Sequence, residues 1–190
     1  MKTAKLLSAL AIAVPALGIV PPSSAGAQTI TPVEAAKPTL KFLMRLYAPL
    51  ELPTMVTDGL IVFHPRENAK GYIQGPNING EMVPPTGDWV RVLPGGNMRI
   101  DVRALIRLGD GTPATIAYNG VLVKPSAESW ERFMQGKKIE APEWHYVVAP
   151  IFETNSKKYA WLNNVQAVGK FVSIQTGPEA HVAFDLYEVL

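Results

Sequence analysis

Hydrophobic and polar residues alternate with a period of two along much of the chain, which is the pattern of β-strands with one buried face. The clearest stretch is residues 98–108, where every even position from 100 onward is apolar and Asp101 and Arg103 lie between them. Asp110-Gly111 follows, a pair typical of hairpin turns. Similar patterns and short apolar runs predict further strands over residues 40–47, 60–64, 89–93, 113–123, 144–152, 165–174 and 181–189. Residues 71–76 and 77–83 contain glycines spaced as in bends or bulges.

One segment has the period of a helix instead. Residues 126–135 are bounded by Ser126, a residue that favours helix N-termini, and by Gly136, which favours the residue after a helix. Trp130 and Phe133 lie three positions apart and form an apolar stripe with Met134. We expect this helix to lie on the sheet and cover one end of it.

About eight short strands, one helix and no alternation of strands with helices predict an all-β, antiparallel fold, either a barrel or a sandwich. Seventeen prolines and fifteen glycines agree with many short strands joined by tight turns. A closed barrel of about eight strands is just wide enough to hold one small ligand. An open barrel edge would favour a homodimer.

The N-terminal segment has the composition of a secretory signal. Lys2 and Lys5 precede an apolar run of residues 6–20, and Ala25-Gly26-Ala27 provides the small residues of a cleavage site. The run is shorter than the roughly 20 residues that span a bilayer. We therefore expect a signal peptide over residues 1–27, a loose arm over 28–39, a barrel domain over 40–190, and a periplasmic or secreted protein with no membrane span after cleavage.

Charge and cysteine content narrow the function further. The chain has 18 basic and 16 acidic residues. Removal of Lys2 and Lys5 with the signal leaves 16 of each, so a nucleic-acid partner is not expected. The absence of cysteine excludes disulfides, thiol nucleophiles and cysteine–metal sites, and the fold must depend on its apolar core.

Four ordered motifs resemble one known family. They are Gly75-Pro76 with Gly80 and Pro84-Pro85-Thr86-Gly87-Asp88-Trp89; Asp101-Val102-Arg103 with Asp110-Gly111 and Tyr118-Asn119-Gly120; Phe152-Glu153-Thr154 with residues 159–163; and Tyr187-Glu188-Val189. Together they resemble the uncharacterised proteins called domain of unknown function 3237 (DUF3237, also UPF0311). The resemblance implies a lipocalin-like (calycin-like) β-barrel and no settled activity. Thr86 departs from the pattern, since the family usually has glycine there, and a secretory signal is not typical of it.

Asp101 and Arg103 are the candidate catalytic pair. Two residues apart on a strand, they share one face, and a carboxylate beside a guanidinium can orient a polar ligand group or act as a base. The family motif favours a role in the cavity. The alternative is a solvent-exposed ion pair on the outside of the sheet.

Other residues are candidates for ligand binding: Asp88, Trp89, Tyr118, His145, Tyr159, Trp161 and Asn163. Asp88 either caps a turn or provides an acid at the pocket mouth, with Trp89 stacking on the ligand. Tyr118 belongs to the second family motif. Tyr159, Trp161 and Asn163 either clamp a ligand or close one end of the barrel. His145 is either a ligand contact or a structural residue.

No metal or cofactor is expected, because the three histidines are not at metal-ligand spacing and no nucleotide or serine-hydrolase motif occurs. Three hypotheses remain. The barrel binds a small hydrophobic or aromatic molecule; it is a cofactor-free acid/base enzyme such as an isomerase, cyclase or lyase; or it is a solid barrel whose loops meet a protein partner.

Overall fold

The computed structural model describes residues 34–67 and 69–190; the predicted signal and the first half of the predicted arm, residues 28–33, lie outside these residues. Residues Lys37–Leu190 form one compact unit. Its strands in chain order are β1 (Leu40–Pro49), β2 (Thr54–Thr57), β3 (Leu60–Phe63), β4 (Tyr72–Gly75), β5 (Ile78–Val92), β6 (Met98–Leu108), β7 (Pro113–Leu122), β8 (Ile139–Glu140), β9 (Tyr146–Thr154), β10 (Ala167–Gln175) and β11 (His181–Val189). The helical segments are α1 (Ala127–Met134), η1 (Ala160–Asn164) and η2 (Gly177–Glu179).

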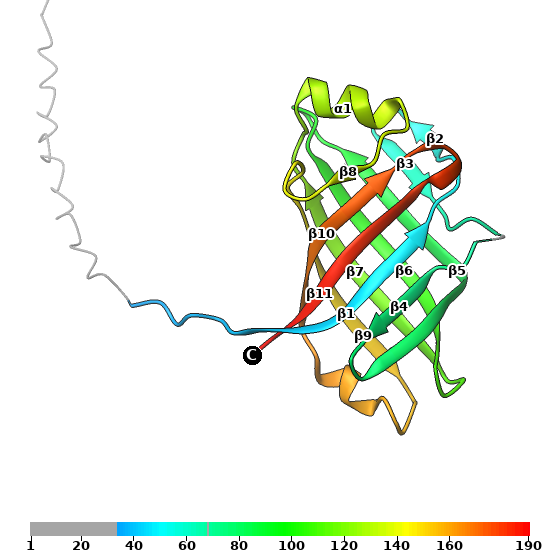
Figure 1. Ribbon diagram of the computed structural model, residues 1–190, viewed down its shortest axis with the longest axis vertical. Helices are drawn as coiled ribbons and strands as arrows, with labels where there is room; N and C mark the ends of the chain where they lie inside the picture. The colour runs from blue at the N-terminus through cyan, green and yellow to red at the C-terminus, as the bar shows by residue number, and fades with distance from the viewer. Residues whose placement is uncertain (1–33, 68) are drawn as a thin grey trace, which may run out of the picture. The chain divides into compact units, whose positions relative to one another are not determined.

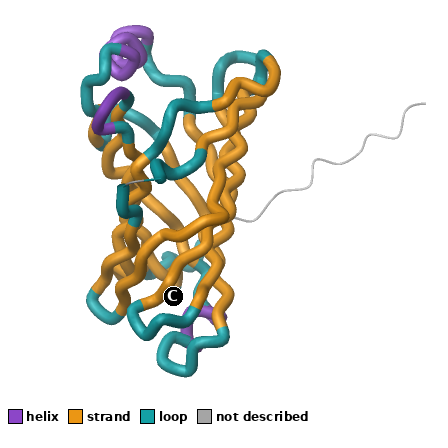
Figure 2. Tube along the Cα trace, turned by 90° about the vertical axis from the view of Figure 1, so that its right-hand side faces the viewer, coloured by secondary structure: helices purple, strands orange, loops and turns teal. Residues whose placement is uncertain are grey.

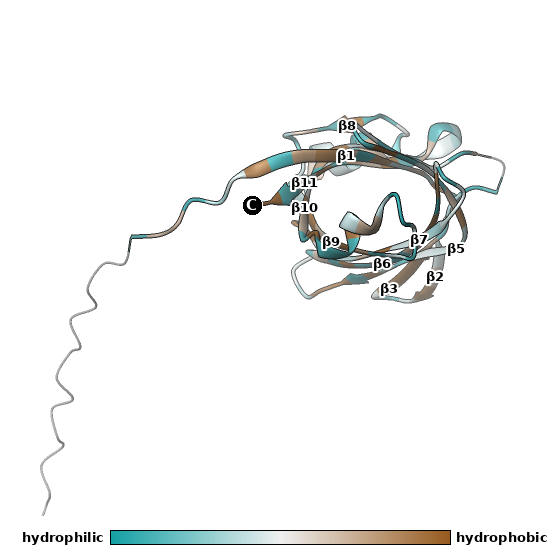
Figure 3. Cartoon of the chain, turned by 90° about the horizontal axis from the view of Figure 1, so that it is seen from below, coloured by the Kyte–Doolittle hydropathy of each residue, from teal (hydrophilic) through white to brown (hydrophobic). Residues whose placement is uncertain are grey.

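Eight of these strands close into an antiparallel barrel (Figures 1 and 3). The ring runs β5-β4-β1-β11-β10-β9-β7-β6 and closes because β6 also pairs with β5. The predicted barrel is thus confirmed, and the sandwich alternative is wrong. The homodimer was expected from an open barrel edge, and the closed ring has no such edge. The homodimer itself stays a prediction.

β4 is short, and β3 covers the remaining gap between β5 and β1. β4 pairs with the first residues of β5, whereas β3 pairs with residues 88–91 of the same strand. An isolated bridge between Leu50 and Pro65 then joins the β3 side to the end of β1. β2, which the hydropathy pattern did not predict, forms a hairpin with β3 outside the ring.

β5 is continuous over the two separate segments, 77–83 and 89–93, that the sequence pattern distinguishes. Its ladder with β6 is interrupted between Val83 and Gly87, because Pro84 and Pro85 have no N–H to donate. Thr86 bridges the interruption: its hydroxyl donates to the Val83 carbonyl at 3.0 Å and accepts from the backbone N–H of Leu105 at 3.1 Å. The residue that departs from the family pattern therefore restores a backbone contact that the prolines remove.

Helical segments and loops gather at the two ends of the barrel (Figure 2). α1 covers one end, as predicted, and Ser126 caps it by accepting from the backbone N–H of Ser129 at 3.1 Å. η1 lies at the other end, where Tyr159 and Leu162 are buried. Aliphatic side chains fill the interior on that side, with Met44, Leu46, Ile106 and Ile116 at 0–1% exposure.

Candidate functional site

The inward face of β6 is its aliphatic face. Ile100 and Val102 are buried, whereas Asp101 and Arg103 are exposed on the outer surface. The expectation that Asp101 and Arg103 face the barrel interior is therefore wrong. Closing the barrel buries the aliphatic positions of the strand, and the two-residue period then places both charged side chains in water.

Asp88 of β5 is the acidic residue that does face inward. It lines two interior cavities, of about 120 and 30 Å³. Both cavities are also lined by Leu50, Phe63 and Val182. Its neighbour Trp89 points outward and is 43% exposed. Of the two predicted contacts, the structure places the acid inside and the indole outside. Trp89 is opposite Asp101 in the register, beside an outer groove.

The larger cavity lies beneath α1 and has mostly apolar walls. Trp130 and Phe133 come from the helix. Tyr146 is the first residue of β9, and Trp144 lies two residues before it. Trp130, Phe133 and Trp144 form one aromatic cluster, with ring centroids 5.0–6.0 Å apart. Aliphatic side chains complete the wall: Ile61, Val90, Met98, Ile100, Leu122, Ile174 and Val182. A cavity of about 120 Å³ has room for a single ring.

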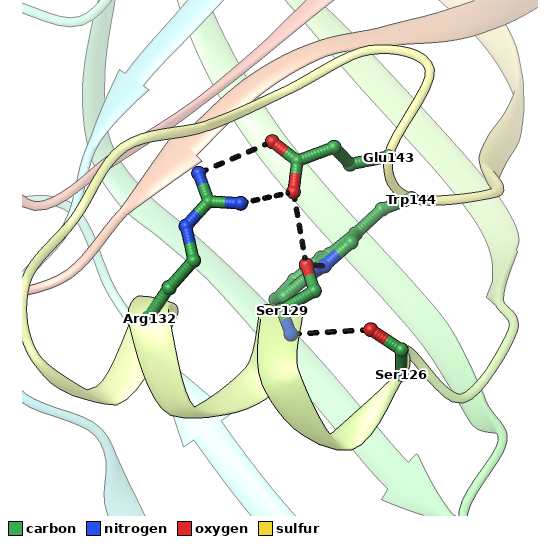
Figure 4. A network of polar contacts seen from close by, with 5 residues as sticks. All are labelled: Ser126, Ser129, Arg132, Glu143 and Trp144. Atoms are coloured by element: carbon green, nitrogen blue, oxygen red, sulfur yellow. Dashed lines mark hydrogen bonds and ion pairs between the residues drawn. The ribbon is translucent and has the colours of Figure 1, made fainter.

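Polar contacts hold the helix over this cavity (Figure 4). The indole Nε1 of Trp144 donates to Ser129 Oγ at 2.6 Å, and both residues are buried. On the surface, Arg132 pairs with Glu143 at 2.7 Å. Ser129 Oγ in turn donates to Glu143 at 3.4 Å. These contacts join α1 to the segment that leads into β9 and fix the position of the aromatic walls.

Asp88 has the chemistry of a functional group. Its Oδ1 is fully buried and has no hydrogen-bond partner among the described residues. Burial raises the pKa of its carboxyl from 3.8 to about 7; a backbone hydrogen bond from Asp101 opposes the rise, and the charge of Asp101 adds to it. A carboxyl that changes charge near neutral pH is suited to proton transfer or to binding a hydrogen-bond donor.

Two buried tyrosines accompany Asp88. Tyr118 of β7 lines the smaller cavity, and Tyr146 of β9 lines the larger. Burial raises the pKa of both phenols well above the ordinary value, and the charge of Asp88 raises them further. Each phenol therefore stays protonated and serves as a neutral hydrogen-bond donor. The position of Tyr118 at the smaller cavity is consistent with its choice as a candidate ligand contact.

The remaining predicted site residues lie elsewhere. His145 is exposed on the outside of the barrel. Tyr159, Trp161 and Asn163 belong to the end opposite α1: Tyr159 is buried, Trp161 is 36% exposed, and the Asn163 amide binds the backbone of Thr154. None of these four lines the cavity beneath α1. Tyr159, Trp161 and Asn163 fit the alternative in which they close the barrel end.

Sequence reasoning did not select Trp130, Phe133, Trp144 and Tyr146 as ligand contacts. The stripe of Trp130 and Phe133 was recognised as apolar but assigned only to packing. Tyr146 is one position after His145, and on a strand that single step separates the inner face from the outer. In the described ranges 34–67 and 69–190, no group of three His, Asp or Glu side chains is arranged to hold a metal ion. No helix in those ranges is long and apolar enough to cross a membrane.

Comparisons with known proteins agree with this architecture. A curated UPF0311 protein of Clostridium acetobutylicum is 34% identical over 94 residues, and the match spans 50% of this chain and 59% of the relative's length. A conserved protein of unknown function from Rhodopseudomonas palustris aligns with a TM-score of 0.70 at 18% identity, over 82% of this chain and all of that one. A β-barrel-like protein from Acinetobacter baumannii aligns with a TM-score of 0.60 at 26% identity, over 83% of this chain and 99% of that one.

The family model named "Protein of unknown function (DUF3237)" matches residues 38–189, which covers the whole barrel. The four motifs therefore belong to one fold: Asp88 is inside it, and Asp101 and Arg103 are on its surface. The chain is a member of the DUF3237 family, which the UPF0311 relative also represents.

Proposed function

We propose that the barrel binds a small, largely apolar molecule of about one ring in the cavity beneath α1, with Asp88 as its polar contact. The observation that carries this proposal is the buried, unpartnered Oδ1 of Asp88 at the wall of an aromatic cavity. A buried polar atom without a partner is costly, and a ligand that donates a hydrogen bond removes the cost. The remaining lining residues offer apolar contact.

Calorimetry with single-ring compounds tests the proposal. Benzyl alcohol is the reference ligand, because its ring fits the aromatic walls and its hydroxyl can donate to Asp88. Val90→Phe projects a larger side chain into the cavity and should abolish binding. Val147→Phe, on the exposed outer face of β9, is the matched control and should leave binding intact. Equal binding by both variants would place the ligand outside the cavity.

Acid/base catalysis in the same cavity is the second candidate, in the class of isomerases, cyclases and lyases. Its base is Asp88 in place of Asp101, because Asp88 is the inward carboxyl and has a pKa of about 7. A general base of this pKa contributes roughly 10²–10⁴-fold. With the single-ring compound isoxazole as probe, Asp88 removes the C3–H proton as the N–O bond breaks to give the enolate of cyanoacetaldehyde. The rate should rise with pH through about 7 and disappear in Asp88→Asn.

The site of action belongs to the proposal as well. We place the protein in the periplasm or outside the cell, on the signal-like composition of residues 1–27. Expression of the full chain in a Gram-negative host, followed by intact mass measurement of the periplasmic fraction, tests this. A mature protein that begins at Gln28 is the expected product, and an uncleaved cytoplasmic chain would contradict it.

A further inference from the structure

We propose that the ligand of the cavity beneath α1 is an organic amine, bound as its ammonium ion between the Asp88 carboxylate and the aromatic side chains. The inference rests on the proposed function, since it names the chemical class that the same cavity selects. Three features of the cavity carry it: the sign of its charge, the aromatic rings in its wall and the unpartnered carboxylate oxygen of Asp88.

The charge of the lining is negative. The cavity wall contains two carboxylates, Asp88 inside and Glu51 in the loop at the mouth, and no Lys, Arg or His among the described residues. His64 borders the smaller cavity on the far side of Asp88, but it is exposed. An anionic ligand such as a carboxylic acid would therefore meet two like charges in the lining. Arg66 lies next to the lining but is not part of it, and its guanidinium already donates to the backbone carbonyls of Leu50 and Gly177. A cation meets the opposite sign at both the mouth and the wall.

The rings around the cavity are suited to a cation. The Trp130, Phe133 and Trp144 rings cluster within 6.0 Å of one another, and Tyr146 lies on the same wall. The faces of aromatic rings attract ammonium groups, tryptophan most strongly, and the attraction grows when water is excluded. The alkyl or aryl part of an amine gains apolar contact with the same rings.

The acid completes the recognition. An ammonium N–H can donate to the unpartnered Oδ1 of Asp88, in a charge-assisted hydrogen bond that is stronger than one from a neutral hydroxyl. The titratable groups that influence this carboxylate are the phenols of Tyr118 and Tyr146 inside the barrel and the charge of Asp101 on its outer surface. None of these groups carries a positive charge, so we expect the ligand to provide the positive charge that pairs with Asp88.

Three matched compounds distinguish the ligand classes by calorimetry on the mature chain: benzylamine, benzyl alcohol and benzoate. At pH 8, where Asp88 is mostly ionised, benzylamine should bind at least about tenfold more tightly than benzyl alcohol, and benzoate should not bind. The preference for the amine should shrink at pH 6, because Asp88 is then mostly protonated. At pH 7 benzylamine should release about half a proton, measured in two buffers of different ionisation enthalpy.

Asp88→Asn should reduce benzylamine binding to the level of benzyl alcohol. Asp58→Asn makes the same chemical change in the exposed turn between β2 and β3 and should alter neither affinity. If benzyl alcohol binds and benzylamine binds no more tightly, the amine inference is overturned and the proposed function stands. If no single-ring compound binds, the proposed function fails. Should Asp88→Asn not fold, the proton release by the unmodified chain decides the inference alone.

Discussion

Asp88 and Asp101 lie on neighbouring strands of one barrel, and their carboxyl groups point in opposite directions. Asp88 is paired with Val102 in the register and faces the interior, whereas Asp101 is paired with Trp89 and faces solvent. The inner carboxyl has a pKa of about 7 because burial disfavours its charged form. The folded state therefore opposes its ionisation, so the stability of the fold should depend on pH.

Between about pH 4 and pH 7, the folded chain holds a proton on Asp88 that the unfolded chain has released. The free energy of unfolding should therefore fall as pH rises through this window and level off above it. An amide cannot ionise, so Asp88→Asn should be more stable than the parent at pH 8 by about 2–4 kcal/mol and no more stable at pH 4. Urea unfolding at both pH values measures the difference. A stability gain that is equal at pH 4 and pH 8 would contradict a buried, titrating carboxyl.

At the scale of elements, two of the contacts that hold α1 over the cavity differ in their burial. The Ser129–Trp144 hydrogen bond is buried, and the Arg132–Glu143 pair has side chains 43% and 35% exposed. Buried donors that lose their acceptor cost more than exposed ion pairs that lose a partner. The two contacts should therefore contribute unequally.

Ser129→Ala leaves the indole N–H of Trp144 without an acceptor and should lower the free energy of unfolding by about 1–3 kcal/mol. Arg132→Ala removes a solvent-screened pair and should cost less than about 1 kcal/mol. Thermal or urea unfolding of the two variants compares them, and tryptophan fluorescence reports whether the Trp144 environment loosens. An equal cost for both would contradict the larger contribution expected from the buried indole contact.

At the scale of the whole molecule, the barrel is packed at one end and hollow at the other. Ile106 is fully buried among the aliphatic residues of the packed end, whereas Ile174 lines the cavity beneath α1 and is only partly buried. A residue that already borders empty space has fewer contacts to lose. The same truncation should thus have different effects at the two ends.

Ile106→Ala should destabilise the protein by about 2–5 kcal/mol, as expected for a cavity made in a packed core. Ile174→Ala should cost less than that and should enlarge the existing cavity, so that it accepts a two-ring compound such as naphthalene. Chemical unfolding gives the stabilities, and quenching of tryptophan fluorescence gives the binding. A larger loss from Ile174→Ala than from Ile106→Ala would mean that the hollow end carries the fold.

Much of the fold is predictable from local pattern. The even positions of residues 98–108, the Asp110-Gly111 turn and the helix between Ser126 and Gly136 all appear as expected, with Gly111 and Gly136 in the left-handed region. Between the predicted segments 77–83 and 89–93 the strand itself does not end, although its ladder with β6 is interrupted at Pro84-Pro85. A hydroxyl three positions after Val83 replaces a ladder bond there, and hydropathy carries no information on such a contact.

The candidate site was less accessible to sequence reasoning. A period of two shows which side chains share a face of a strand, and it assigned Asp101 and Arg103 to one face of theirs. Which face lies inside depends on how the strands pair around the closed ring. Barrel closure buries dozens of apolar side chains, and their summed stabilisation exceeds the cost of enclosing one carboxyl. That balance over the whole ring put Asp88 in the cavity and left Asp101 in solvent.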